Sequence, residues 1–424
     1  MKVLVIGGGG REHAIAWKLR QSPRVTEVIC TPGNGGISDE ATCLPSDVKD
    51  VPALVALAQK LGVDLTVVGP EIPLNLGIVD EFQRRGLRIF GPTKAAAQLE
   101  SSKSFAKEFM RRQNIPTPHY AVCRNMDDVK SALPLFKTPL VVKADGLAAG
   151  KGVVIAQTRE EASQTAEEML SGKVLAGAGS RVVLEEFLEG EEVSFLVLSD
   201  GERVAPLVAA QDHKRIGDGN TGANTGGMGA YSTDSLLDAQ MRDWLITHIA
   251  KPVVAGMKAE EMEYRGILYC GLMMTARGPM VLEFNCRFGD PETQPILMRL
   301  ESDLLDAFEA SVDGRVSDGD FKWSTDATAC VVIASGGYPD VFETGKVISG
   351  LQEAGQVEGV KVFHAGTSKR GNDFITSGGR VLGVTARARD LGLALDRAYE
   401  AAGKISFKGM YYRKDIGARA LVKK

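Results

Sequence analysis

Short apolar runs and amphipathic stretches alternate along the first hundred residues. Four of the runs predict buried strands, and the stretch Arg11–Trp17 after the first of them has helical character. Strands that alternate with helices are typical of a parallel sheet, whose ligand edge lies at the carboxyl ends of the strands. We therefore predict an N-terminal α/β domain over residues 1–102. The predicted strands are Lys2–Ile6, Val25–Thr31, Asp64–Gly69 and Leu87–Phe90.

Four consecutive glycines, Gly7–Gly10, separate the first predicted strand from the helix. Free backbone N–H groups and the helix dipole both face such a turn, which favours an anion. We expect Gly9, Gly10 and Arg11 to hold a phosphorylated group of a substrate. A dinucleotide fold would also need an acidic residue at the end of the second strand. Cys30-Thr31-Pro32 stands there instead, which argues against NAD.

Polar and apolar side chains alternate in the segment Val281–Pro295. On an extended strand, Glu283, Asn285 and Arg287 lie on one face. Mg²⁺ takes one or two oxygen ligands from protein and the rest from water and substrate phosphates, so we predict a metal at Glu283 and Asn285. The planar guanidinium of Arg287 suits a carboxylate or a phosphate. A solvated edge strand is the alternative, but the acidic turn that follows argues against it. The expected core positions are Leu282, Phe284, Cys286 and Phe288.

A helical stretch, Lys94–Arg112, is ended by the prolines of Ile115–Pro118. By itself, Lys103 on this helix has the features of a surface lysine. The next apolar run ends at Lys143, which needs an anionic partner because an unpaired buried charge is costly. A glycine-rich loop and a second β-type run follow. Residues 138–156 therefore predict a hairpin that closes over phosphates.

The loop of this hairpin differs from a Walker A motif. Its glycines are one residue too close, neither Ser nor Thr follows Lys151, and a β-type run rather than a helix comes next. Backbone N–H groups at Gly146, Gly150 and Gly152, together with Lys151, are the candidates for phosphate contacts.

Residues 181–198 indicate a strand that ends at Leu184, a connector Glu185–Leu188, and a second strand. The exposed backbone of such a connector can imitate a base-pairing edge, which suits adenine. Glu191 or Glu192 is placed to accept hydrogen bonds from ribose hydroxyls. A solvated acidic turn is the alternative for this segment taken alone.

Composition narrows the functional classes. The 424 residues carry 50 basic and 54 acidic side chains, a net charge of −4, and no basic stripe, so nucleic acid is not an expected partner. Six scattered cysteines without a C-x-x-C spacing fit a reducing cytoplasm, where we expect the protein. No apolar run approaches the roughly 20 residues that span a bilayer. No histidine or cysteine group has the spacing of zinc ligands.

Four features occur in the order found in the ATP-grasp superfamily, which the chain resembles over residues 103–312. They are Lys103, Lys143 with its glycine hairpin, the acidic connector, and Glu283-x-Asn285. The resemblance implies two α+β lobes that hold Mg-ATP between them and activate a carboxylate as an acyl phosphate. The implied ATP contacts are Lys103, Lys143, Gly146, Gly150, Lys151, Gly152, Glu185, Glu186, Leu188 and Glu192.

The same resemblance implies that Glu283 and Asn285 bind Mg²⁺ or Mn²⁺. Many ATP-grasp enzymes have a further acidic ligand on the preceding strand. The corresponding segment here, Ile267–Met274, has no carboxylate, which leaves a second metal ion open.

Two further segments indicate which family within this superfamily the chain resembles: Gln211–Arg215 and the glycine-rich loop Asn220–Ser232. Asp212, Lys214 and Arg215 place one anion and two cations on a short segment, which suits an amino acid, although a solvated charged loop has the same composition. The strings P-G-N-x-G, A-D-G-L-A-A-G-K-G-V and E-F-N-C-R-F-G-D-P-E-T-Q occur in the same order as in a known family. With them, the chain resembles the phosphoribosylamine–glycine ligase family of the monofunctional bacterial type.

That resemblance implies ATP-dependent ligation of glycine to 5-phosphoribosylamine through glycyl phosphate, which gives glycinamide ribonucleotide, ADP and phosphate in purine biosynthesis. Arg287 would hold a substrate carboxylate or phosphate, and Asp212 or Asp290 would take the proton of the amine. The implied substrate contacts are Gly9, Gly10, Arg11, Lys214, Asn224, Gly226, Gly227, Gly289 and Glu292.

We expect an ATP-grasp domain over residues 103–326, with the hairpin lobe at about 123–190, and a C-terminal α+β domain over residues 327–424. The expected partners are small molecules, with no membrane. A monomer or weak dimer is expected, with transient contact to the enzyme that makes phosphoribosylamine. The alternatives are another ATP-grasp carboxylate–amine ligase, a biotin-dependent carboxylase subunit, and a nucleotide-binding regulatory protein without turnover.

Three histidines stand in these motifs. His364, in F-H-A-G, is expected to be a structural histidine. His13 and His213 each adjoin a predicted anion site, so a role in binding stays open for both.

Overall fold

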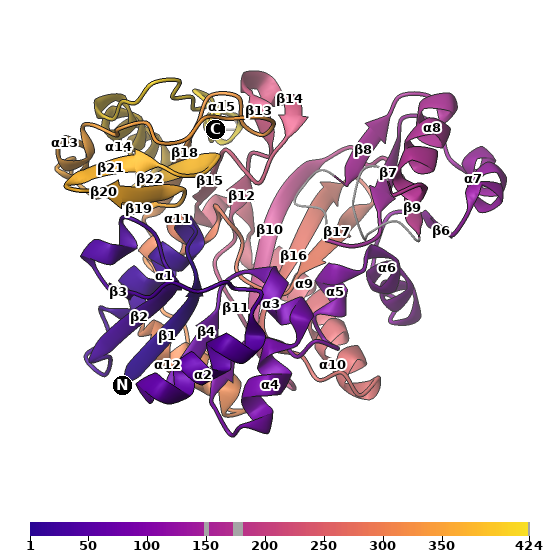
Figure 1. Ribbon diagram of the computed structural model, residues 1–424. Coiled ribbons are helices and arrows are strands. Elements are labelled where there is room, and N and C mark those ends of the chain that lie inside the picture. The colour runs from indigo at the N-terminus through magenta and orange to yellow at the C-terminus, as the bar shows by residue number, and fades with distance from the viewer. Residues whose placement is uncertain (148–151, 173–180, 423–424) are drawn as a thin grey trace.

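A computed structural model describes residues 1–147, 152–172 and 181–422 (Figure 1). The N-terminal unit is a parallel sheet with the strand order β3-β2-β1-β4-β5. Burial on both faces explains the apolar runs, since every residue of β1 after Lys2 is buried. The N-terminal strands are β1 (Lys2–Gly7), β2 (Glu27–Pro32), β3 (Thr42–Cys43), β4 (Leu65–Val68) and β5 (Ile89–Phe90). The α/β expectation for this part of the chain is confirmed.

Local signals account for the helices of this unit. Asp50 caps α2 by accepting a hydrogen bond from Ala53 N–H, and Gly62 ends the helix in the left-handed region. The glycine turn leads into α1 as predicted, and Gly9 is its N-cap. The helices are α1 (Gly10–Leu19), α2 (Val51–Leu61), α3 (Glu71–Leu76) and α4 (Ile78–Arg84), with the 3-10 turn η1 (Ile37–Asp39).

The hairpin lobe stands apart from the N-terminal unit, at the right of Figure 1. Its antiparallel sheet has the order β6-β9-β7-β8, and β7 and β8 form the predicted hairpin. Helix α8 packs on β7 and β8, and α7 packs on α8 and β6. The lobe comprises β6 (Tyr120–Cys123), α7 (Met126–Ala132), η2 (Leu133–Leu135), β7 (Leu140–Ala144), β8 (Val153–Ala156), α8 (Arg159–Leu170) and β9 (Val182–Glu186).

The central sheet, β11-β10-β16-β17, separates two cores. Alternate residues of β10 pack in opposite directions: Phe195 and Val197 face α6, α9 and α10, whereas Leu196 and Leu198 face α12 and the N-terminal unit. The sheet therefore packs on the N-terminal unit with one face and on α6, α9 and α10 with the other. Its elements are β10 (Glu191–Asp200), β11 (Val204–Pro206), β16 (Arg265–Thr275), β17 (Gly278–Asn285), α5 (Gln98–Ser101), α6 (Lys103–Arg112), α9 (Ala239–Leu245), η5 (Ile246–Ala250), α10 (Lys251–Ala259) and α12 (Leu304–Val312).

The C-terminal sheet, β12-β15-β18-β22-β19, includes two strands from the middle of the chain. β12 (Gln211–Asp212) and β15 (Gly229–Ser232) pair next to β18, so the segment with Asp212 joins the central and C-terminal parts. The remaining elements are β13 (Arg215–Gly217), η3 (Asp218–Asn220), β14 (Thr221–Asn224), η4 (Asp234–Leu236), α11 (Thr293–Arg299), β18 (Ala327–Ala334), α13 (Leu351–Gly355), β19 (Val360–His364), β20 (Thr367–Arg370), β21 (Asp373–Thr376), β22 (Arg380–Ala388), α14 (Leu391–Lys404) and α15 (Ala418–Val422).

Three local predictions were wrong. The predicted helix Lys94–Arg112 is divided at Ser102, which is extended and caps α6 by accepting from Phe105 N–H. The predicted core residue Leu282 lines a pocket, because a bulge between β16 and β17 interrupts the alternation there. The strand predicted to end at Leu184 continues to Glu186. Among the described residues, no helix is both long and apolar enough to cross a bilayer.

Candidate active site

One large pocket, about 1070 Å³, extends from the hairpin lobe across the central sheet to the C-terminal sheet. Most of the predicted site residues line it, although they come from all parts of the chain. Gly9, Gly10 and Gly227 do not line it, and Gly150 and Lys151 lie outside the described residues. The lining residues that were predicted are Arg11, Lys103, Lys143, Gly146, Gly152, Glu185, Glu186, Leu188, Glu192, Asp212, Lys214, Asn224, Gly226, Glu283, Asn285, Arg287, Gly289, Asp290 and Glu292.

Glu283 and Asn285 lie two residues apart on β17 and both face the pocket. Burial alone would raise the pKa of Glu283, but the ammonium groups of Lys214, Lys143 and Lys103 hold it at about 2. The carboxylate is therefore charged, and with the Asn285 carbonyl it offers the hard oxygen ligands that Mg²⁺ prefers. Within the described residues, no group of three His, Cys, Asp or Glu side chains could hold a metal. The remaining ligands of a magnesium ion here would be water or substrate oxygens, as is usual for Mg²⁺.

The lysines at the lobe end of the pocket are fixed by the surrounding protein. Lys103 Nζ donates to the Gly146 carbonyl over 2.9 Å, so it lies in the pocket rather than on the surface. Lys143 Nζ lies 2.8 Å from Glu185 Oε2, which is the anionic partner that its buried position required. Lys107, which the sequence analysis did not select, lies 3.2 Å from Glu185 Oε1.

The connector Phe187–Gly190 follows β9 and lines the same end of the pocket. Leu188 is buried. Glu186 Oε1 accepts a hydrogen bond over 2.7 Å from Nη2 of Arg277, a residue that does not line the pocket. Glu192 lies 3.0 Å from Lys214 Nζ, which is also 3.5 Å from Glu283 Oε1. Lys214 thus pairs both with Glu192, which is predicted to bind ribose, and with Glu283, which is predicted to bind the metal.

Two carboxyl groups, Asp212 and Glu292, lie at the C-terminal end of the pocket. Glu292 is buried and accepts hydrogen bonds from Ser194 Oγ at 3.0 Å and from the Tyr269 hydroxyl at 2.9 Å. Burial and the Glu292 carboxylate raise the pKa of Asp212 well above its usual range, although Lys214 opposes the shift. Among the described residues, Asp212 Oδ1 has no hydrogen-bond partner. Such a group can accept a proton or pair with a substrate cation.

Asp290 is held by an arginine from the C-terminal sheet. Arg380 Nη2 donates to Asp290 Oδ2 over 2.9 Å, and Arg380 Nη1 donates to the carbonyls of Asp290 and Gly226, each over 2.6 Å. Burial alone would raise the pKa of Asp290, but Arg380 and Arg11 hold it below its usual range. Gly227 has a φ of +111°, and a Cβ there would lie 2.4 Å from Pro291 Cδ. Glycine is therefore required where this loop meets the Asp290 turn.

One backbone N–H group of the predicted anion-binding turn is already bonded to a side chain of the helix that follows it. Glu12 accepts from Gly9 N–H over 2.6 Å and pairs with Arg11 Nε over 2.6 Å. Gly10 lies against α11 and the Asp290 turn, since a Cβ there would be 2.6 Å from Gln294 Nε2 and 3.6 Å from Asp290 Oδ1. The glycines thus allow α1 to approach this turn closely.

Arg287 contacts two glutamates that the sequence analysis did not select. Its Nη2 lies 2.8 Å from Glu100 Oε1 and its Nε lies 3.5 Å from Glu71 Oε2. Glu71 follows the third predicted strand in the string V-G-P-E, and this position at a strand end could have identified it as a site residue. Neither Glu100 nor Arg380 stands in a motif whose chemistry was recognisable locally.

The three histidines occupy enclosed positions. His13 Nδ1 accepts from the His364 backbone N–H over 2.8 Å, which joins α1 to β19. His364 Nδ1 lies 3.0 Å from Thr367 Oγ1, and His213 Nε2 accepts from Gly417 N–H over 3.2 Å. Burial lowers the pKa of His364 to about 3 and that of His213 to about 4. Both rings are therefore neutral at pH 7.

Acid is expected to destabilise the fold through His364. The unfolded chain binds a proton on this residue below pH 6.5, whereas the folded chain does not until about pH 3, so the free energy of unfolding falls as the pH falls. Between pH 6.5 and 4 the loss is about 3 kcal/mol. Urea unfolding at several pH values should show a smaller pH dependence for His364→Gln. The exposed His248→Gln is the control, and an unchanged dependence in His364→Gln would contradict the assignment.

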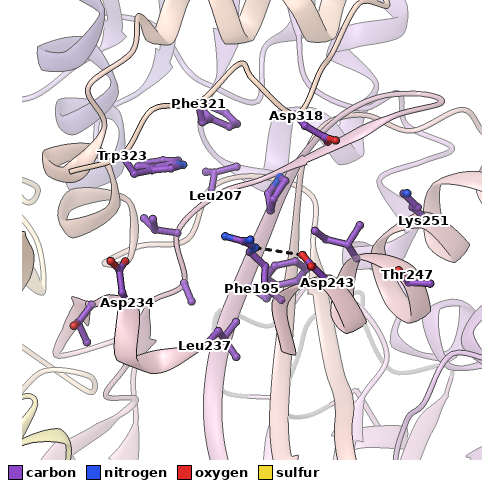
Figure 2. A pocket seen from close by; sticks show the side chains of 16 residues that line it. Phe195, Leu207, Asp234, Leu237, Asp243, Thr247, Lys251, Asp318, Phe321 and Trp323 are labelled. Carbon is purple, nitrogen blue, oxygen red and sulfur yellow. Dashed lines mark ion pairs between the residues drawn. The ribbon is translucent and has the colours of Figure 1, made fainter. Parts of the chain in front are cut away.

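A second pocket, about 470 Å³, lies between β10, β11, α9 and the segment with Asp318, Phe321 and Trp323 (Figure 2). The rings of Phe321 and Trp323 lie 5.3 Å apart on one side of it. Arg242 and Asp243 both line it and form an ion pair of 3.6 Å, the dashed line in Figure 2. No predicted site residue lines this pocket, so the larger one is the candidate active site.

Family models match almost the whole chain. The N domain of phosphoribosylglycinamide synthetase matches residues 1–100, its ATP-grasp (A) domain matches residues 101–293, and its C domain matches residues 328–419.

Individual relatives agree with these matches. The phosphoribosylamine–glycine ligases of Vibrio vulnificus and Pseudomonas aeruginosa are each 50% identical over 429 residues, which is 100% of this chain and 99% of theirs. The crystal structure of the phosphoribosylamine–glycine ligase of Thermotoga maritima is 32% identical, with a TM-score of 0.86 over 98% of this chain and 100% of that one. The biotin carboxylase domain of a Hydrogenobacter thermophilus 2-oxoglutarate carboxylase covers 97% of this chain and 91% of its own, with a TM-score of 0.75. At 18% identity it shares the fold alone. The chain belongs to the phosphoribosylglycinamide synthetase family.

Proposed function

We propose that the protein is an ATP-dependent carbon–nitrogen ligase that joins glycine to 5-phosphoribosylamine. The glycine carboxylate attacks the γ-phosphorus of ATP, which gives glycyl phosphate and ADP. The amine of phosphoribosylamine then displaces phosphate and forms glycinamide ribonucleotide. No protein nucleophile is needed, so the protein contributes positioning and charge.

One observation carries the proposal: the pocket has cations and metal-type ligands at one end and carboxyl groups at the other. Lys103, Lys143 and Glu283 lie at the lobe end, and Asp212 and Glu292 lie at the C-terminal end. A triphosphate at the lobe end and an amino acid at the carboxyl end would place the reacting carboxylate near Glu283.

Glu283 and Asn285 are the residues that would hold a magnesium ion, with manganese as a substitute. Bound there, the ion would offset the charge that develops on the phosphoryl oxygens. The lysines act in the same direction, because fixed positive charge in an enclosed site stabilises the transferring group. Arg287, held by Glu100 and Glu71, presents its remaining donors to a substrate carboxylate or phosphate.

Asp212 and Asp290 differ in their suitability as proton acceptors. The pKa of Asp290 is low because Arg380 pairs with it, so this carboxylate is a poor base. The pKa of Asp212 is raised, which brings it nearer to that of a useful base. We therefore assign the proton of the attacking amine to Asp212, and we assign Asp290 to holding substrate in place together with Arg11.

In this proposal each of the three expected domains has its own role. Residues 1–102 contribute Arg11, which lines the substrate end of the pocket and would hold the phosphoribosyl group. Residues 103–326 hold ATP and the metal, and residues 327–424 contribute Arg380 and close the substrate end. The β12 and β15 strands, which lie in the C-terminal sheet, connect the last two units.

Phosphate release is expected only when ATP, glycine and phosphoribosylamine are all present. The measurement uses Mg-ATP, glycine and freshly generated phosphoribosylamine, with each substrate omitted in turn. Bicarbonate replaces glycine in a further control, since a carboxylase would then turn over ATP. Release without glycine, or release that depends on bicarbonate, would overturn the proposed substrate while leaving the ATP-grasp family in place.

A further inference from the structure

A buried cluster of three charges lies beneath the lobe end of the pocket. It consists of Glu185 on β9, Lys143 on β7 and Lys107 on α6. The Glu185 carboxylate is 1% exposed and bridges the two ammonium groups, with Lys107 at 3.2 Å and Lys143 at 2.8 Å. The cluster therefore carries a net charge of +1, and the two cations share one anion.

Lys107 is fixed from two further directions. It is 2% exposed, and its Nζ donates to Thr117 Oγ1 over 2.7 Å and to the Val281 carbonyl over 3.5 Å. It lies one helical turn after Lys103, so both lysines lie on the α6 face that lines the pocket. Burial lowers the pKa of Lys107 to about 8 although Glu185 opposes the shift, so the side chain is charged at pH 7.

The shared carboxylate changes what Lys143 can do. If Glu185 had only Lys143 as a partner, the two would form a neutral buried pair, and the attraction of Lys143 for a phosphate would be largely offset. Because Lys107 is a second partner, Glu185 shares its charge between two ammonium groups and offsets that of Lys143 only in part. Lys143 is also held at the Leu282 carbonyl, which it contacts over 3.2 Å, so its ammonium stays at the pocket wall.

We propose that Lys107 is a positioning residue of the nucleotide site: by sharing the Glu185 carboxylate, it leaves Lys143 with net positive charge toward the polyphosphate. The inference rests on the proposed binding of ATP and does not depend on which acid or amine the enzyme joins. Nucleotide binding measured without these substrates therefore tests it separately from the ligase reaction.

The main experiment compares Lys107→Met with the double variant Lys107→Met/Glu185→Gln by calorimetric titration. The probes are a non-hydrolysable ATP analogue with Mg²⁺, and adenosine, which has no phosphate. In Lys107→Met the cluster is neutral, so the Kd of the ATP analogue should rise about tenfold, in the range of measured couplings between charged neighbours. The Kd of adenosine should not change. In the double variant the net charge is again +1, so the Kd of the analogue should return to within about threefold of wild type.

Two comparisons separate this role from a purely structural one. A structural role predicts equal weakening of the ATP analogue and adenosine, without recovery in the double variant, and either result would overturn the proposal. If Lys107→Met does not fold, the double variant decides alone: a Kd tenfold or more above wild type rejects the inference. Lys107→Arg, which keeps the charge, should bind like wild type. Lys130→Met, which removes an exposed lysine of α7, is the matched control.

Discussion

Replacement of Glu283 by glutamine is expected to lower kcat about 10³-fold, in line with the loss of one preorganised electrostatic group. Glutamine keeps the size of the side chain and an oxygen that can bind a metal, but it removes the negative charge. In the native site this carboxylate stays ionised because three lysines surround it. Without its charge, the metal would bind more weakly and the lysines would repel one another.

Two measurements check this expectation. Phosphate release at saturating substrates gives kcat, and its dependence on Mg²⁺ concentration gives the apparent metal affinity, which should fall together with kcat. Thermal unfolding shows whether the fold is retained. Glu353→Gln, which changes an exposed glutamate on α13, is the control. Activity above about one tenth of wild type in Glu283→Gln would mean that the metal is held elsewhere.

Replacement of Arg380 by methionine is expected to reduce kcat/KM for glycine about 100-fold, because removing one partner of a buried charged pair costs several kcal/mol. The change leaves the Asp290 carboxylate without its guanidinium partner and frees the Gly226 carbonyl. Both groups lie at the substrate end of the pocket. The Kd of ADP should stay unchanged, since the nucleotide would bind at the lobe end.

The readouts are steady-state kinetics with glycine and phosphoribosylamine, and calorimetric titration with ADP. Arg380→Lys should recover only part of the activity, because lysine keeps the charge but cannot form the planar fork. Arg389→Met removes an arginine just after the end of β22, whose side chain is 84% exposed, and it should behave like wild type. An equal loss of ADP affinity in Arg380→Met would indicate a general disturbance of the fold instead.

The spacing of apolar residues and the chemistry of single segments were enough to predict most of the helices and strands. The apolar runs of the N-terminal unit, the hairpin around Lys143 and the strand with Glu283 are each recognisable within ten to twenty residues. Burial on both faces of a parallel strand leaves a continuous apolar run, and a half-buried strand leaves alternation, so both patterns survive in the sequence. The ends of elements were harder to predict, because Ser102 also donates to Asp145 of the hairpin lobe and the bulge at Leu282 depends on the pairing of β17 with β16.

The candidate site divides in the same way. Lys143, Glu283 and Asn285 were selected from their own segments, since a charge beside an apolar run or at alternate strand positions is unusual enough to notice. Lys103 was selected only through the resemblance to the ATP-grasp superfamily. Only the tertiary structure brought Lys107 to Glu185, and Arg380 to a carboxylate 90 residues away in the chain. The energy of a buried charge depends on the partner that the fold brings beside it, and no local pattern specifies that partner. The sequence by itself therefore indicated candidate residues for the chemistry, and the tertiary structure decided which charges balance them.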